Sequence, residues 1–209
     1  YLNIFTLPTA GEVGGLSSGT EQYYAFDYAN VHIVSLDSQL AIRDTVNRAA
    51  MLQWLQDDLA VNSQDWTIVI FHHPPYTKGS HDSDSQLGGI DQPIFAIREE
   101  FTPVFEQYGV DLAYAGHSHI YERSYYINGH YGLSGTFNPA TMAELNGLGE
   151  PANGQGAEAY TQISVGSGID DKVVYTVAGN GGHVTSTSAG FPHPANFFSQ
   201  LEIGSVVID

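Results

Sequence analysis

The stretch Asp111–Ser124, DLAYAGHSHIYERS, decides how this sequence is interpreted. Residues 110–115, VDLAYA, form an apolar run of the length expected for a buried strand. Gly116 ends the run, and two histidines with one serine between them follow it. In extended chain, residues i and i+2 project from one face, so His117 and His119 can point at one spot. The stretch therefore predicts a strand whose end carries two imidazoles.

A second apolar run, WTIVIF at 66–71, ends in a similar way. The run is followed by HHPP, and Pro74 and Pro75 cannot donate the backbone hydrogen bonds of a continuing strand. His72 and His73 are therefore expected at the carboxyl end of this strand. Functional groups of layered α/β folds collect beyond such strand ends, so the two histidine pairs are expected to meet.

Two amphipathic helices are predicted around these strands. From Asp44 to Ala60, apolar residues recur at helical spacing, and Asp44 is suited to cap the N-terminus. A second helix is expected over about 93–107, and Gly109 is expected to end it. The central region thus predicts the order strand, helix, strand, loop, helix, strand.

Further strands are predicted outside this central region. Residues 23–37, YYAFDYANVHIVSLD, predict two strands, and 173–179 and 203–209 predict one each. The segment from about 130 to 170 is rich in Gly, Asn and Ala, and we expect a loop-rich insertion with one short helix around 139–146. The whole pattern is typical of an α/β fold with a layered β-sheet and flanking helices.

Composition limits the classes of function. The chain has 209 residues, with 23 Asp and Glu against 6 Lys and Arg, a net charge of −17. The few cations are scattered, which argues against a nucleic-acid-binding patch or an anionic membrane surface as partner. The absence of cysteine excludes disulfides, thiolate metal sites and cysteine nucleophiles. We expect an acidic protein in an extracellular or periplasmic setting, without a membrane span.

Three neutral imidazoles at one sheet edge favour Zn, Fe, Mn or a similar ion. In a hydrolytic site such an ion lowers the pKa of bound water to about 7. The spacing alone leaves open the alternative that the histidines are hydrogen-bonded loop or core residues.

Several segments resemble the calcineurin-like metallophosphoesterases, in particular their purple-acid-phosphatase-like branch. YYAFDYANVHIVSLDS is similar to a strand pair of that branch, MLQWLQDDLA to a helix, DWTIVIFHHPPY to its histidine–proline motif, VDLAYAGHSHIYERS to its GHxH motif, and VVYTVAGNGG to a later strand and loop. The resemblance runs from about Asn3 to Gly182 and is weakest over 130–170. It implies the C-terminal half of a metallophosphoesterase β-sandwich, αββα, with residues 1–209 as a single partial domain.

The resemblance also implies a function and its residues. Family members bind two metal ions, Fe with Zn, Mn or Fe, and hydrolyse phosphate esters with water activated on the metal, as acid-phosphatase-like phosphomonoesterases do. His72 and His117 match ligands of the second metal, and His119 matches a ligand of the first. His81 falls near the place of a histidine that contacts the substrate phosphate or protonates the leaving group.

Three more residues are expected near these ligands without binding metal. His73 occupies a position that varies in the family and is interpreted as a loop residue or one that orients a ligand. Glu122 and Arg123 follow the GHxH motif, and we interpret them as an internal ion pair that orients this loop and its histidines.

The earlier motifs of the family do not occur in these residues. They comprise an Asp after the first strand, a bridging Asp with a nearby Tyr, and an Asn in a GNH segment. The sequence contains no GD dipeptide, and its only GN is Gly179-Asn180. We therefore expect a C-terminal half that meets a second chain, or a further segment, carrying the N-terminal half.

A two-metal site needs a bridging carboxylate, because the two cations repel each other at about 3.5–4 Å. Three imidazoles cannot supply that negative charge, so these residues alone are expected to bind at most one ion. Asp37, Asp82 and Asp84 are considered as replacement carboxylates, but a turn cap and two solvated residues are the favoured interpretations. A phosphodiesterase or nucleotidase, and a non-catalytic remnant or binding module, remain as alternative functions.

Overall fold

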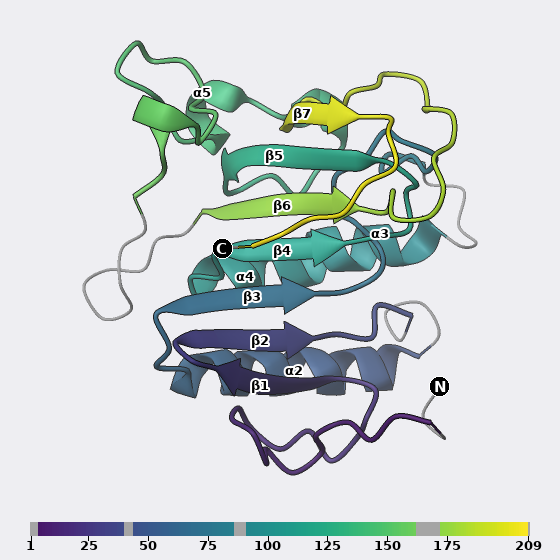
Figure 1. The fold of residues 1–209 in the computed structure, drawn as a ribbon, viewed down its shortest axis with the longest axis vertical. Coiled ribbons are helices and arrows are strands. Elements are labelled where there is room, and N and C mark those ends of the chain that lie inside the picture. The colour runs from purple at the N-terminus through teal and green to yellow at the C-terminus, as the bar shows by residue number, and fades with distance from the viewer. Residues whose placement is uncertain (1–3, 40–43, 86–90, 162–171, 209) are drawn as a thin grey trace.

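The computed structural model describes residues 4–39, 44–85, 91–161 and 172–208. Within these ranges seven strands form one sheet in the order β1-β2-β3-β4-β6-β5-β7 (Figure 1). The strands are β1 (Tyr24–Tyr28), β2 (Val31–Ser35), β3 (Trp66–Ile70), β4 (Leu112–Ala115), β5 (Tyr121–Ile127), β6 (Val173–Ala178) and β7 (Asn196–Gln200). The helices are α2 (Thr45–Val61), α3 (Gln92–Ala96), α4 (Thr102–Gln107) and α5 (Pro139–Met142), with a π-helical turn at Ile97–Phe101 and 3-10 turns at Ser134–Thr136 and Gly156–Glu158.

The centre of the sheet is parallel. Strands β2, β3, β4 and β6 run in the same direction, while β1 and β5 are antiparallel to their neighbours. The carboxyl ends of the four parallel strands consequently open on one edge of the sheet. The two histidine pairs follow β3 and β4, which are direct neighbours, and this arrangement brings their loops together.

The main helices cover one face of the sheet (Figure 1). Buried residues of α2 and of the helical segment 92–107, such as Leu55 and Phe105, pack in the same core as Val69 of β3. On the other face of β3, Trp66 and Ile70 are 43% and 37% exposed. The predicted α/β fold with flanking helices is confirmed, and over β3 one face of its sheet carries exposed apolar side chains.

The helical segment 92–107 contains a π-helical turn at Ile97–Phe101. Pro103 follows this turn and cannot donate the α-helical hydrogen bond to the residue four positions earlier, so a local widening before it is a common accommodation. Gly109 ends the segment with φ +68°, and the N–H of Val110 donates to the carbonyl of Phe105 at 2.9 Å. The predicted helix is therefore confirmed, interrupted by one wider turn.

The predicted strand at 203–209 is wrong over its described part, because residues 203–208 lie outside the strands. The outermost strand is instead β7, which pairs with β5. The C-terminal segment runs across the front of the sheet in Figure 1, and Gly204 N donates to Asn180 O at 3.3 Å. β5 was not predicted as a strand, although it pairs with both β6 and β7.

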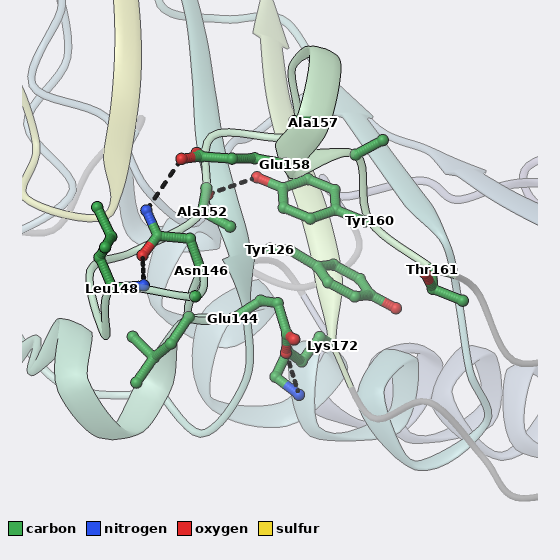
Figure 2. A pocket seen from close by; sticks show the side chains of 13 residues that line it. Tyr126, Glu144, Asn146, Leu148, Ala152, Ala157, Glu158, Tyr160, Thr161 and Lys172 are labelled. Atoms are coloured by element: carbon green, nitrogen blue, oxygen red, sulfur yellow. Dashed lines mark hydrogen bonds and ion pairs between the residues drawn. The ribbon is translucent and has the colours of Figure 1, made fainter.

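The described part of the insertion, up to residue 161, contains the short helix α5, close to the predicted position. Tyr126 of β5 stacks on Tyr160 with ring centroids 4.8 Å apart, and Lys172 pairs with Glu144 at 3.2 Å. Figure 2 shows the pocket between these side chains. None of the described helices has the length and apolar character that crossing a membrane requires.

Candidate metal centre

The loops after β3 and β4 place His72, His73 and His117 side by side. Nε2 of His72 lies 3.1 Å from Nδ1 of His117, and the rings of His73 and His117 are 4.5 Å apart. Gly116 N donates to the carbonyl of His72 at 3.1 Å, which ties the two loops together. One ligand atom from each of the three histidines lies within 4.8 Å of the others, so the group has the chemistry and spacing to hold an ion.

The backbone of His117 is unusual. Its φ is +60°, in the left-handed region that non-glycine residues rarely adopt. Such conformations are costly and cluster at functional sites, where surrounding structure maintains them. Here the turn after Gly116 directs the His117 ring toward His72 rather than along the line of β4.

Asp91 brings a carboxylate to this group. Its Oδ1 lies 2.7 Å from Nδ1 of His81 and 2.9 Å from Nε2 of His117. The two imidazoles stack with centroids 3.8 Å apart, and the side chains of His81, Asp91 and His117 are 20%, 20% and 10% exposed. These three residues form a second group with suitable donor atoms, and His117 belongs to both groups.

Burial keeps the central imidazoles neutral. It lowers the pKa of His117 below its ordinary value, against the hydrogen bond to Asp91, and it lowers the pKa of His73 to about 3. A neutral imidazole retains the lone pair that a metal ion requires. His72 is exposed, so the group is open to solvent on that side.

His119 belongs to neither of these groups, although its ring is near enough to His72 to help lower the pKa of His72, after burial and His81. Its backbone N–H donates to Ser80 Oγ at 2.9 Å, and its ring faces His183 at 5.3 Å. Among the described residues, no carboxylate forms an ion pair with His119. The structure therefore brings together His72 and His117 of the three expected ligands, and leaves His119 outside.

His73 is fully buried, and both ring nitrogens have neighbours. Nδ1 lies 2.7 Å from Ser38 Oγ, and Nε2 lies 3.4 Å from Nε2 of Gln39. Ser38 Oγ also accepts the backbone N–H groups of His72 and His73, each at 3.3 Å. Ser38, just after β2, thus fixes the start of the histidine–proline loop.

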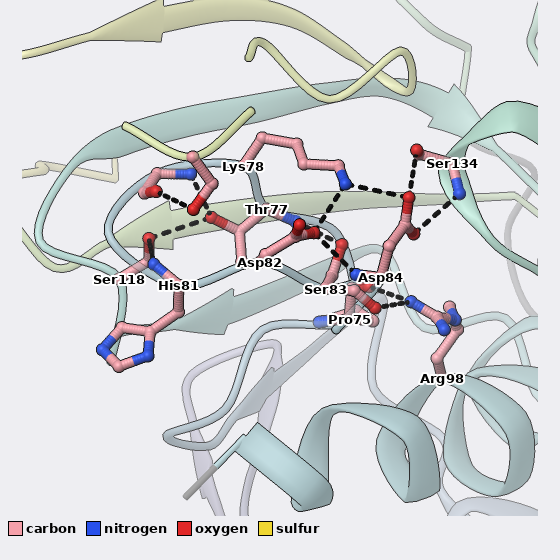
Figure 3. Close-up of polar contacts among 12 residues, drawn as sticks. Pro75, Thr77, Lys78, His81, Asp82, Ser83, Asp84, Arg98, Ser118 and Ser134 are labelled. Carbon is pink, nitrogen blue, oxygen red and sulfur yellow. Dashed lines mark hydrogen bonds and ion pairs between the residues drawn. The ribbon is translucent and has the colours of Figure 1, made fainter. Parts of the chain in front are cut away.

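The loop that carries His81 is held by a buried cation (Figure 3). Lys78 Nζ contacts Asp82 at 2.5 Å and Asp84 at 2.9 Å, and the Lys78 side chain is 6% exposed. Asp84 also accepts the backbone N–H of Ser134 at 2.8 Å. Asp82 and Asp84 therefore brace the loop and are not simply solvated. Neither belongs to a group of described residues with the spacing of metal ligands.

Arg98 and Ser118 complete the support of this loop. Nη1 of Arg98, a residue that is 1% exposed, donates to the carbonyls of Ser83 at 2.7 Å and Pro75 at 3.3 Å. Ser118, between the two histidines of HSH, accepts the backbone N–H of His81 at 3.4 Å (Figure 3). The position of His81 is consequently coupled to the GHxH loop.

The expected ion pair between Glu122 and Arg123 is not formed. Neighbours in a strand project to opposite faces, and Glu122 is fully buried where it accepts hydrogen bonds from the Thr77 hydroxyl and from Lys78 N. Burial raises the pKa of Glu122. Arg123 lies with its guanidinium 4.7 Å from the ring centroid of Phe197. Glu122 therefore supports the His81 loop without Arg123 as its partner.

The two remaining aspartates at this edge differ in role. Asp37 Oδ1 accepts the N–H of Gln39 at 2.9 Å, which agrees with its interpretation as a turn cap. Sequence reasoning missed Asp91, because an Asp two residues before Pro93 is typical of a helix start. In the structure Asp91 is the N-cap residue of α3, but its side chain makes no capping hydrogen bond.

The profile of the calcineurin-like phosphoesterase family matches residues 2–121, which is more than half of the chain. The chain belongs to the calcineurin-like phosphoesterase family. Its relatives include purple acid phosphatases, in agreement with the purple-acid-phosphatase-like branch expected from the motifs.

The relatives of this phosphoesterase chain include plant enzymes. Purple acid phosphatase 1 of Ipomoea batatas is 34% identical over 120 residues, covering 56% of this chain and 23% of the relative. Purple acid phosphatase 18 of Arabidopsis thaliana is 28% identical over 145 residues, covering 66% and 29%. The chain thus spans about a quarter of the length of these curated relatives.

A solved structure supports the fold. A purple acid phosphatase from yellow lupin seeds superposes with a TM-score of 0.56 at 19% identity, covering 98% of this chain and 34% of the lupin chain. Metal ions are implied by family membership. The two side-chain groups around His117 fit a single ion, whereas His119 lacks the neighbouring ligands that a second ion would need among the described residues.

Proposed function

We propose that the protein to which this phosphoesterase chain belongs hydrolyses phosphate monoesters in the manner of acid phosphatases. The observation that carries the proposal is the pair of imidazole nitrogens, His72 Nε2 and His117 Nδ1, that face each other at 3.1 Å on the carboxyl edge. Two ligand atoms about 2.1 Å from one ion and at right angles to each other lie about 3.0 Å apart, so this spacing suits a shared ion.

In this proposal the side chains have separate roles. His72 and His117 hold an ion, and His119 contributes to a second ion together with ligands from outside these residues. The bound ions, Fe with Zn, Mn or Fe, supply positive charge that lowers the pKa of water and neutralises phosphoryl oxygens. His81 stacks on His117 and is placed to approach the ester oxygen of the leaving alcohol.

The charge of the chain supports metal ions as the source of attraction for an anionic ester. The net charge is −17, and the nearby cation Lys78 is neutralised by Asp82 and Asp84. A phosphate ester approaching this edge therefore needs the positive charge of the ions. We also propose an extracellular or periplasmic setting. A phosphodiester or a nucleotide is the alternative substrate class.

A partner segment is part of the proposal. The exposed apolar side chains of Trp66 and Ile70 on the face opposite the helices suit the packing of further sheet structure, carried by an N-terminal half of the domain or by a second chain. Such a segment would bring the carboxylates that a two-metal site requires.

The test is turnover of p-nitrophenyl phosphate by a longer protein, in which a segment with the family's Asp, Tyr and Asn motifs precedes these 209 residues. We expect turnover that depends on added Fe, Zn or Mn and is lost in a His117→Ala variant, whereas Asp57→Asn on the exposed side of α2 retains it. Inactivity with all three metals would contradict the proposal.

A second function is favoured by the separate position of His119. A module that binds one ion through His72 and His117, with water in the remaining coordination positions and without catalysis, needs no second ion. It would bind one ion per chain with an affinity that inorganic phosphate does not change, and the longer protein would be inactive.

A further inference from the structure

The Asp91 carboxylate accepts two imidazole N–H groups with a single oxygen. Oδ1 lies 2.7 Å from Nδ1 of His81 and 2.9 Å from Nε2 of His117. An ionised carboxylate only accepts hydrogen bonds, so each imidazole must carry its proton on the nitrogen that faces Asp91. This arrangement fixes the tautomers of both histidines.

The fixed tautomers leave one lone pair on each ring. His117, protonated at Nε2, keeps its lone pair at Nδ1, the atom that lies 3.1 Å from Nε2 of His72. His81, protonated at Nδ1, keeps its lone pair at Nε2, on the side of the ring away from Asp91. Metal-ligating histidines commonly donate their other N–H to a carboxylate in this way.

The shorter of the two Asp91 contacts distinguishes this role from that of a direct ligand. Two atoms bound to one zinc ion at 2.0–2.1 Å are separated by about 2.8–3.4 Å for angles between 90° and the tetrahedral value. The 2.7 Å between Asp91 and His81 is shorter than that range and is typical of a charge-assisted hydrogen bond. The 2.9 Å between Asp91 and His117 lies inside the range, so the contact with His81 is the one that separates the two roles. The 3.1 Å between His72 and His117 lies inside the range.

The position of Asp91 in the fold explains why its carboxylate is available. It is the N-cap residue of α3, where an Asp side chain ordinarily accepts a helix N–H, but no such bond is formed. Pro93 lies in the first turn and has no N–H to offer, and Ile94 of the same turn is fully buried. The buried helix start thus anchors Asp91, and its side chain is turned to the histidines.

We propose that Asp91 is a positioning residue, which holds His117 with Nδ1 directed at the ion and His81 with Nε2 directed at the ester. The chemistry of the ion and the ester rests on the proposed function. The tautomers and the shared carboxylate are properties of this chain, and they are measurable without substrate.

The first test is the affinity of the 209-residue chain for Zn²⁺, measured by isothermal titration calorimetry. Loss of a carboxylate that orients a metal-bound histidine typically weakens binding about 10- to 100-fold, and we expect this for Asp91→Asn. Asp37→Asn removes the same charge at the same edge without touching a histidine, and is expected to bind Zn²⁺ within about twofold of the parent chain. Equal losses in both variants would show that only the net charge matters and would overturn the proposal.

The second test reads the tautomers directly by long-range ¹H–¹⁵N NMR of the histidine rings without metal. We expect His117 protonated at Nε2 and His81 at Nδ1 in the parent chain, and tautomer mixtures for both in Asp91→Ala. The circular dichroism spectrum of each variant verifies that it is folded, and Asp91→Glu, which keeps the acceptor, is expected to restore part of the tautomer preference.

The outcomes separate the two proposals. Unchanged tautomers in Asp91→Ala would refute the positioning role, whatever the activity of the longer protein. An inactive longer protein with the expected tautomers and Zn²⁺ affinities would refute the proposed function and leave the role of Asp91 intact.

Discussion

Two clusters of histidine and aspartate in this chain have similar distances and opposite arrangements. In one, the single imidazole of His32 lies between two carboxylates, 2.7 Å from Asp27 and 2.8 Å from Asp58. In the other, the single carboxylate of Asp91 lies between the imidazoles of His81 and His117. The first cluster is centred on a residue that is 1% exposed, whereas the second lies at an open sheet edge.

The arrangement determines what each cluster can do. Burial alone would lower the pKa of His32, but the hydrogen bonds to Asp58 and Asp27 outweigh it and raise the pKa. The carboxylate of Asp58 also accepts the N–H of Leu16 at 2.5 Å, which fastens the N-terminal loop to α2. A charged imidazole enclosed by carboxylates has no lone pair for a metal ion. Asp91, in contrast, is one carboxylate shared by two imidazoles. Each ring therefore keeps a lone pair on the nitrogen that does not face Asp91.

The largest effect on stability is expected from removing one carboxylate of the buried His32 cluster. Removing one partner of a buried ion pair costs about 3–5 kcal/mol, and we expect Asp58→Ala to lower the free energy of unfolding in urea by that amount. Asp57→Ala on the exposed side of the same helix is the matched control, with an expected change within about 0.5 kcal/mol. Similar losses of unfolding free energy in the two variants would contradict a stabilising role of the His32 cluster.

A metal ion should stabilise the chain through the second cluster alone. Zn²⁺ at 100 times its dissociation constant is expected to add about 2.7 kcal/mol to the free energy of unfolding. The increment should vanish in His117→Ala and survive in Asp58→Ala, whose lost carboxylate contacts His32 near the start of β2 and no histidine of the candidate site. Urea titrations with Zn²⁺ and with EDTA measure it, and an increment that persists without His117 would place the ion elsewhere.

His193 is a buried histidine with no ion pair to a carboxylate among the described residues, and it gives the opposite pH dependence to His32. Burial lowers the pKa of His193 to about 3. The unfolded chain therefore binds this proton first, so the stability from neutral His193 is present above pH of about 6.5 and is lost as the pH falls toward 3. Between pH 8 and pH 5 the loss is about 2 kcal/mol, and His193→Gln is expected to remove it from the pH profile of unfolding.

His32 provides the contrasting half of that measurement. Because its folded pKa is raised, its contribution is fully present below the unfolded pKa of about 6.5 and is lost as the pH rises through the folded pKa. A His32→Gln variant should therefore lose the decline on the alkaline side. Identical profiles for the His32 and His193 variants would mean that partner carboxylates do not govern these histidines.

The smallest effect should be that of Asp91→Asn on stability. The side chain is 20% exposed and makes no helix cap, so the free energy of unfolding without metal should change by no more than about 0.5 kcal/mol. If Asp91→Asn lowered the free energy of unfolding as much as Asp58→Ala in the same urea titration, the Asp91 cluster would be a stabilising element of the fold like the His32 cluster.

Local sequence patterns predicted most helices and strands of the fold. They failed where strand formation depends on pairing with a strand that is distant in the sequence. The helix at Thr45–Val61 with its Asp44 cap, and the strands before both histidine pairs, follow from periodicity and turn residues. The segments 196–200 and 203–209 are both partly apolar, and the one that pairs with β5 became the strand. No local signal distinguishes them.

The part of the site that follows directly from the ends of the parallel strands was predictable from the sequence. His72 and His117 meet because β3 and β4 are parallel neighbours. The turn of His119 toward His183 depends on the loop after β6, which spacing does not reveal. Asp91 carried only the signal of a helix start, because its contact with the histidines depends on how α3 is placed against the loop after β4.

The most direct measurement is anomalous X-ray scattering at the zinc edge from crystals of the chain grown with Zn²⁺. The expected result is one peak at the carboxyl edge of the sheet, about 2.0–2.1 Å from Nε2 of His72 and Nδ1 of His117, with Asp91 hydrogen-bonded to the far nitrogen of His117. A peak coordinated by Asp91 itself, or no peak beside His117, would contradict the account.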